Sequence, residues 1–171
     1  MLHSVTAVYS ARVLELACGS GQLTLPLHRL AGYWEATDFS EPMAAETARR
    51  CPGVKTAVQD ATALTYPDGS FNRVILANAL HIMPEPAKAL AEIRRVLTED
   101  GILLAPTFVY EGKVNRLRMK LTSLVGFRTY AHWTLTELGE FLEGQGFRVL
   151  ESRLLPGSPL PEGFAAAAKK P

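Results

Sequence analysis

The sequence has few cysteines, almost no net charge and no long hydrophobic run. Its 171 residues include only Cys18 and Cys51, too few for a disulfide scaffold and without metal-site spacing. The formal net charge is +1, whereas a protein that binds nucleic acid normally carries a basic excess. No apolar run approaches the roughly 18 residues of a membrane span, and the first residues lack a signal-peptide pattern. We therefore expect a reduced, cytoplasmic protein with no metal, nucleic-acid or membrane partner.

One basic group tests that expectation. It consists of Lys113, Arg116, Arg118, Lys120 and Arg128, and its apolar neighbours recur at helical spacing. This pattern favours a solvated helix face over a site for a polyanion.

What the chain does have is a globular composition, with 47% hydrophobic and 20% charged residues. Its length fits one domain over residues 1–171 with a substantial core. We expect strands at 12–16, 33–37, 54–59, 71–77, 102–110, 147–154 and 164–169. We expect helices at 22–30, 41–50, 86–97, 114–125 and 134–143. This alternation predicts an α/β fold: a doubly wound, mostly parallel, Rossmann-like sheet with helices on both faces and an antiparallel edge strand near the C-terminus.

Local signals refine the expected helices. Thr134 and Glu137 have the spacing of a capping box, so they should begin the helix at 134–143. In the helix at 86–97, we expect Lys88, Glu92 and Arg95 to face outward. The pair at 100–101, Asp-Gly, predicts a turn before the next strand.

The first expected strand ends in an acid, Glu15, and runs into a turn that contains Gly19 and Gly21. Nucleotide-like cofactors bind beyond the carboxyl ends of such strands. A phosphate-binding P-loop would need a lysine that is missing here. A dinucleotide-binding turn would need a third glycine, where this chain has Thr24. A carboxylate aimed at the crevice would also repel a pyrophosphate, but it would suit a ligand that carries an ammonium and a sulfonium group.

Five ordered motifs resemble those of the class I S-adenosylmethionine-dependent methyltransferases, in the small-molecule branch of the ubiquinone and menaquinone biosynthesis enzymes. Residues 15–21 resemble the first motif, with Ala17 where glycine is usual. Residues 37–40, followed by Met43, resemble the second, and residues 59–61 the third. Residues 76–81 resemble the fourth, and the helix end at 94–97 with the following Asp-Gly is also characteristic. The similarity extends over nearly the whole chain.

The resemblance implies S-adenosylmethionine as cofactor and roles for particular residues. Asp38 would accept hydrogen bonds from the ribose hydroxyls, and Asp60 with the Ala61 backbone would bind adenine between Phe39 and Met43. Glu15, the turn backbone and Asn78 would hold the methionine portion. The expected cofactor-binding set is Glu15, Ala17, Cys18, Gly19, Gly21, Asp38, Phe39, Met43, Asp60, Ala61 and Asn78. No catalytic residue is assigned, and a structural role for His81 is at least as well supported as a functional one.

The resemblance also implies methyl transfer to a small-molecule acceptor by in-line displacement. Residues 1–11 are short compared with the N-terminal segment whose helices cover the cofactor in this family. We therefore expect cap helices to be absent. A non-catalytic or truncated domain that acts as a cofactor-binding module or subunit stays open as the alternative, and so does a homodimer.

Overall fold

The computed structural model describes residues 10–110, 130–156 and 161–170. The strands are β1 (Arg12–Leu16), β2 (Tyr33–Asp38), β3 (Lys55–Val58), β4 (Phe71–Leu76), β5 (Leu97–Leu104), β6 (Thr107–Phe108), β7 (Phe147–Leu155) and β8 (Glu162–Lys169). The helices are α2 (Thr24–Leu27), α3 (Glu41–Arg50), α4 (Pro86–Val96) and α6 (Leu135–Gly144), with short 3-10 turns at His28–Leu30 and Leu80–Ile82. The expected helix at 114–125 and the basic group at 113–128 lie outside the described residues.

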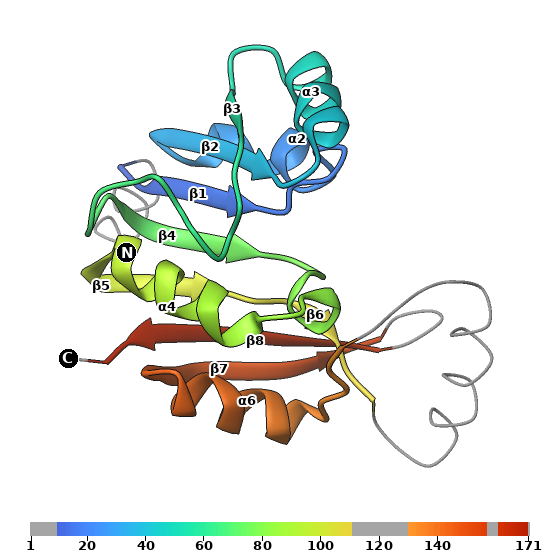
Figure 1. The fold of residues 1–171 in the computed structure, drawn as a ribbon, viewed down its shortest axis with the longest axis vertical. Helices are drawn as coiled ribbons and strands as arrows, with labels where there is room; N and C mark the ends of the chain where they lie inside the picture. The colour runs from blue at the N-terminus through green and yellow to red at the C-terminus, as the bar shows by residue number, and fades with distance from the viewer. Residues whose placement is uncertain (1–9, 111–129, 157–160, 171) are drawn as a thin grey trace.

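All eight described strands join one sheet in the order β3-β2-β1-β4-β5-β8-β6, with β7 paired to β8 (Figure 1). The five strands from β3 to β5 run parallel, and β8 is antiparallel to both β5 and β7. The predicted doubly wound α/β fold is confirmed. The antiparallel strand near the C-terminus is β8, which lies inside the sheet because β7 pairs with its outer side.

Helices cover both faces of this sheet. On one face, Leu90 and Ile93 of α4 and Leu138 and Leu142 of α6 join the main apolar core. Leu27 of α2 packs on the other face against the second cluster, which contains Trp34 and Ile75 of the strands. Within the described ranges, no helix is long and apolar enough to cross a membrane.

Several boundaries differ from the sequence expectations. The helix expected at 22–30 is α2 followed by a 3-10 turn; Pro26 lies inside it and has no backbone N–H to donate. The strand expected at 102–110 is divided into β5 and β6, with Pro106 between them. The expected Asp-Gly turn at 100–101 instead lies within β5, which begins directly after α4 and pairs irregularly with β4 near this point. The predicted capping box at Thr134 is confirmed.

The connection from β3 to β4, residues 59–70, is unusual for a doubly wound sheet. None of these residues, all of which the structure describes, is helical. We call this segment the strap. Its Leu64 is buried in the main core, and Tyr66 packs edge-on against Phe71. The strap therefore covers part of the sheet that a crossover helix covers in most such folds.

Candidate cofactor site

A cavity of about 570 Å³ lies at the carboxyl ends of β1 to β4. Its wall includes the strand ends and the residues just beyond them, Leu16, Ala17, Asp38, Phe39, Gln59, Asp60, Ala61, Ala77 and Asn78. Its size is within the range of small-molecule and cofactor sites. It also occupies the edge where open α/β sheets bind ligands. Sequence motifs that lie 60 residues apart thus meet around one space.

The glycine loop, residues 17–21, is held by backbone geometry and by α3. Ala17, Gly19 and Gly21 all have positive φ, which disfavours a side chain. A Cβ on Gly21 would come within 3.1 Å of Thr47 Oγ1. Thr47 donates to the Gly19 carbonyl at 2.8 Å, and Arg50 donates to the Ser20 carbonyl at 2.6 Å. The loop is therefore a fixed turn against α3.

Asp38 joins this loop to the end of β2. Its Oδ2 accepts the Gly19 N–H at 2.8 Å, and its Oδ1 accepts the Ser40 N–H at 2.8 Å. A carboxylate has about four acceptor positions. These two bonds therefore leave one position on each oxygen for ligand hydroxyls, which fits the predicted contact with ribose.

Glu15 does not line the cavity. It is buried beneath the loop, where its Oε2 accepts hydrogen bonds from Thr24 Oγ1 at 2.6 Å and Trp34 Nε1 at 2.9 Å. Burial raises the pKa of this carboxyl, and the two hydrogen bonds oppose the shift. The geometry corrects the expectation of a carboxylate aimed into the crevice, because the Glu15 side chain binds α2 and β2 and is not part of the cavity wall. Thr24, at the position of a third glycine, is one of its two partners.

Cys18 also faces away from the cavity. Its side chain is buried against Thr47, and burial raises the pKa of its thiol to about 11. Its backbone N–H is bonded to the Thr37 carbonyl. Cys18 therefore contributes a small side chain to the turn rather than a ligand contact.

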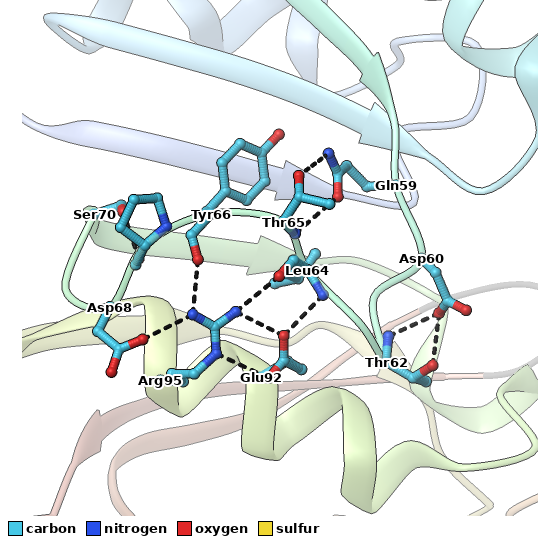
Figure 2. Close-up of polar contacts among 11 residues, drawn as sticks. Gln59, Asp60, Thr62, Leu64, Thr65, Tyr66, Asp68, Ser70, Glu92 and Arg95 are labelled. Atoms are coloured by element: carbon cyan, nitrogen blue, oxygen red, sulfur yellow. Dashed lines mark hydrogen bonds and ion pairs between the residues drawn. The ribbon is translucent and has the colours of Figure 1, made fainter.

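Asp60 and Ala61 line the cavity from the strap. Asp60 Oδ1 accepts hydrogen bonds from both the backbone N–H and the hydroxyl of Thr62, and these bonds lower the pKa of its carboxyl (Figure 2). Phe39 also lines the cavity, and 75% of its surface is exposed. Met43, at 40% exposure, is not among the lining residues. An exposed aromatic ring beside the cavity suits a planar ligand, and the adenine contact of Phe39 stays a prediction.

Asn78 follows β4 in a left-handed conformation, with φ of 51°. Its N–H donates to the Pro106 carbonyl at 2.7 Å, and its Nδ2 donates weakly to Glu162 at 3.4 Å. Its Oδ1 is buried and has no hydrogen-bond partner among the described residues. Buried acceptors are nearly always satisfied, and Asn78 as a residue forms part of the cavity wall.

His81 lies apart from the cavity wall. Its ring is buried, contacts the edge of Phe108 and shares a hydrogen bond of 2.9 Å between Nδ1 and Thr107 Oγ1. Burial lowers the pKa of His81 to about 4, so the ring is neutral at physiological pH. This arrangement favours the structural reading of His81.

Sequence reasoning missed the residues that hold the strap. Arg95 and Glu92 of α4, which were expected to face outward, bind the strap backbone instead (Figure 2). Tyr66 donates to the buried carboxylate of Glu35 at 2.6 Å. The available signal was an acid and a base three residues apart on one helix, which equally describes an ordinary surface pair.

Comparisons with known proteins identify the family of this chain. The family described as "Methyltransferase domain" matches residues 14–105. Demethylmenaquinone methyltransferase of Renibacterium salmoninarum is 37% identical over 108 residues, which are 63% of this chain and 46% of the relative. Its counterpart in Clavibacter sepedonicus is 30% identical over 176 residues, 90% of this chain and 72% of the relative. The chain thus spans about half the length of the first relative and most of the second.

Solved structures agree on the fold. An S-adenosylmethionine-dependent methyltransferase from Thermotoga maritima superposes with a TM-score of 0.78 at 22% identity, covering 99% of this chain and 87% of the other. The 1,6-didemethyltoxoflavin-N1-methyltransferase of Burkholderia thailandensis, solved with S-adenosylhomocysteine, gives a TM-score of 0.77 at 23% identity, covering 99% and 75%. At these identities the likeness is one of fold.

Proposed function

Because this chain belongs to the class I S-adenosylmethionine-dependent methyltransferases, we propose that it transfers a methyl group from S-adenosylmethionine to a small-molecule acceptor. The observation that carries the proposal is the meeting of all four motif-bearing strand ends around one cavity of about 570 Å³. Each wall offers a group of the type that one part of the cofactor requires.

We assign each part of the cofactor to the residues of the cavity wall that could bind it. Asp38 accepts from the ribose hydroxyls, because both of its oxygens keep acceptor positions beside the glycine loop. Asp60 and the Ala61 backbone bind the adenine edge, and Phe39 covers the ring. The backbone of Ala17 and the backbone carbonyl of Asn78 receive the ammonium group. Glu15, Cys18, Gly19 and Gly21 act through the shape of the loop.

When bound, S-adenosylmethionine supplies a methyl group on a sulfonium, which leaves as a neutral thioether. The protein's contribution is then to align the acceptor and to exclude water. Ile82, Met83 and Pro84 give the cavity an apolar wall beyond Asn78. No described residue is assigned as a general base.

The acceptor that we propose to test first is a quinone of the demethylmenaquinone class. Two observations support it: the name shared by the relatives above, and the apolar wall at residues 82–84, which suits a hydrophobic ring system. A reduced, cytoplasmic setting and a homodimer stay predictions from the sequence.

Calorimetric titration with S-adenosylmethionine and S-adenosylhomocysteine tests cofactor binding. Asp38→Ala should weaken both affinities about 10- to 100-fold, the usual effect of losing charge-assisted hydrogen bonds. Glu99→Ala is the matched control, because Glu99 is an exposed carboxylate paired with Lys169 away from the cavity. Absence of binding by the wild type at millimolar ligand would refute the proposal.

Methyl transfer separates the enzyme from the alternative of a cofactor-binding module. Transfer of a labelled methyl group to a demethylmenaquinone analogue would support the enzyme. Tight cofactor binding with no transfer to any acceptor of a panel would favour the module.

A further inference from the structure

The strap carries two of the proposed adenine contacts but has no helix of its own to satisfy its backbone. A segment buried against a sheet needs partners for its N–H and C=O groups. Leu64 lies at the centre of the strap and is 6% exposed, so its backbone in particular needs such partners. They come from α4.

Arg95 is fully occupied by this task. Its guanidinium donates to the carbonyls of Leu64 at 2.8 Å and Tyr66 at 2.7 Å (Figure 2). It also donates to Asp68 at 2.8 Å and twice to Glu92, at 2.9 and 2.7 Å. An arginine side chain has five N–H donors, so each donor has an acceptor here. A lysine could form at most three of these bonds.

Glu92 binds the other backbone group of Leu64, as an acceptor rather than a donor. Its Oε2 accepts the Leu64 N–H at 2.8 Å while both of its oxygens bind Arg95. The pair therefore satisfies both backbone groups of Leu64, one as acceptor and one as donor. In effect, two side chains of α4 do for the strap what helical hydrogen bonds do for a crossover helix.

Hydrogen bonds within residues 59–65 connect Leu64 to the residues that line the cavity. The Ala63 N–H donates to the Asp60 carbonyl at 3.0 Å, and Asp60 in turn binds Thr62. Gln59 closes the same turn through Thr65, by a bond of 2.8 Å from its Nε2 to the hydroxyl. Leu64 lies between Ala63 and Thr65, which both bond back to this turn, so fixing Leu64 fixes the direction in which Asp60 and Ala61 meet the cavity.

We propose that Arg95, with Glu92, is a positioning residue of the cofactor site: it holds the strap in the conformation that presents Asp60 and Ala61 to the adenine. The inference rests on the proposed function for the identity of the ligand. It also gives α4 a role in the site, although its residues Glu92 and Arg95 are not part of the cavity wall.

The test compares Arg95→Met and Arg95→Lys with Arg94→Met. Arg94 is the neighbouring arginine on the same helix, but it donates to the Lys170 carbonyl at 3.3 Å, away from the strap. Arg95→Met should raise the dissociation constant of S-adenosylhomocysteine about tenfold or more, because the ligand must then order the strap itself. Arg95→Lys should lie between, and Arg94→Met should bind like wild type. All affinities are measured below the unfolding transition of each variant.

A double-mutant cycle with Asp60→Ala tests whether Arg95 affects cofactor affinity through the strap. If Arg95 acts through the strap, the loss caused by Arg95→Met should shrink in the Asp60→Ala background. An unchanged affinity in fully folded Arg95→Met would overturn the inference, as would a full, additive loss in the double variant. Hydrogen exchange of residues 59–66 provides a ligand-free test, and unchanged protection in Arg95→Met would also overturn it. Failure of the wild type to bind S-adenosylhomocysteine would instead count against the proposed function.

Discussion

The glycine loop and the strap both line the same cavity, but they are built in different ways. The loop at 17–21 has positive φ at three of its five residues, and it is also held by side chains of β2 and α3 that lie 19 to 30 residues away in the sequence. The strap at 59–70 is held by side chains of α4 and β2 that are about 30 residues distant in sequence. Backbone geometry adds to the side-chain bonds in the loop, whereas the strap, in which only Gly69 has positive φ, depends mainly on side-chain bonds. The strap should therefore be the more easily loosened of the two.

The largest expected effect breaks the glycine loop. Gly21→Ala places a Cβ at φ +77° and 3.1 Å from Thr47 Oγ1, and we expect a loss of about 2–3 kcal/mol in the free energy of unfolding. Gly53→Ala is the matched control, since its φ is +94° but a Cβ there meets nothing within 4 Å. Urea denaturation of both variants measures the difference. Equal losses would show that contact with Thr47 does not restrict the loop.

The next effect loosens the strap alone. Tyr66→Phe removes the bond of 2.6 Å to Glu35, and we expect a loss of about 1.5 kcal/mol together with faster hydrogen exchange in residues 59–68. Tyr33→Phe removes the other tyrosine bond to the same carboxylate, but Tyr33 lies on β2. It should reduce stability without increasing exchange in the strap. Similar exchange in the two variants would contradict a local role for Tyr66.

These two regions also show what could be predicted from the sequence. The glycine loop was predictable because its signal is local: an apolar strand, small residues and an acid at the end of the next strand. The strap was not, because Arg95 and Glu92 have the spacing of a solvent-exposed pair and nothing local to them reveals their partners at residues 64–68. Glu15 illustrates the same limit. Its place in the motif was evident, but its direction depends on Thr24 and Trp34.

A smaller effect depends on pH and separates the two regions again. The bond from Arg95 lowers the pKa of the Glu92 carboxyl below its ordinary value of 4.5. A carboxyl whose pKa is lower in the folded state contributes stability above its unfolded pKa and loses it as the pH falls through the folded one. Protection of the strap should therefore decrease below about pH 4.5.

The control variant for this pH effect is Glu92→Gln, which cannot titrate at this position. It should show weaker protection of the Leu64 N–H at pH 7 and a flatter dependence on pH below 4.5, because the titrating group is gone. Hydrogen exchange measured at several pH values, corrected for the intrinsic rate, reads this directly. A pH dependence that matches the wild type would assign the transition to another carboxyl.

The smallest expected effect is that of Ala17→Gly, which tests whether alanine at this position strains the glycine loop. Its φ is +54°, a region that disfavours alanine by about 1–2 kcal/mol. Glycine in turn lowers the free energy of unfolding by about 0.4–1 kcal/mol, because it increases the entropy of the unfolded chain. Ala17→Gly should therefore be neutral or stabilise the protein by up to about 1 kcal/mol. Ala63→Gly, in the strap and outside the positive-φ set, should be destabilising by about 0.4–1 kcal/mol. Opposite signs for the two substitutions in urea denaturation would show that backbone strain belongs to the loop and not to the strap, and losses of equal size in both would contradict that view.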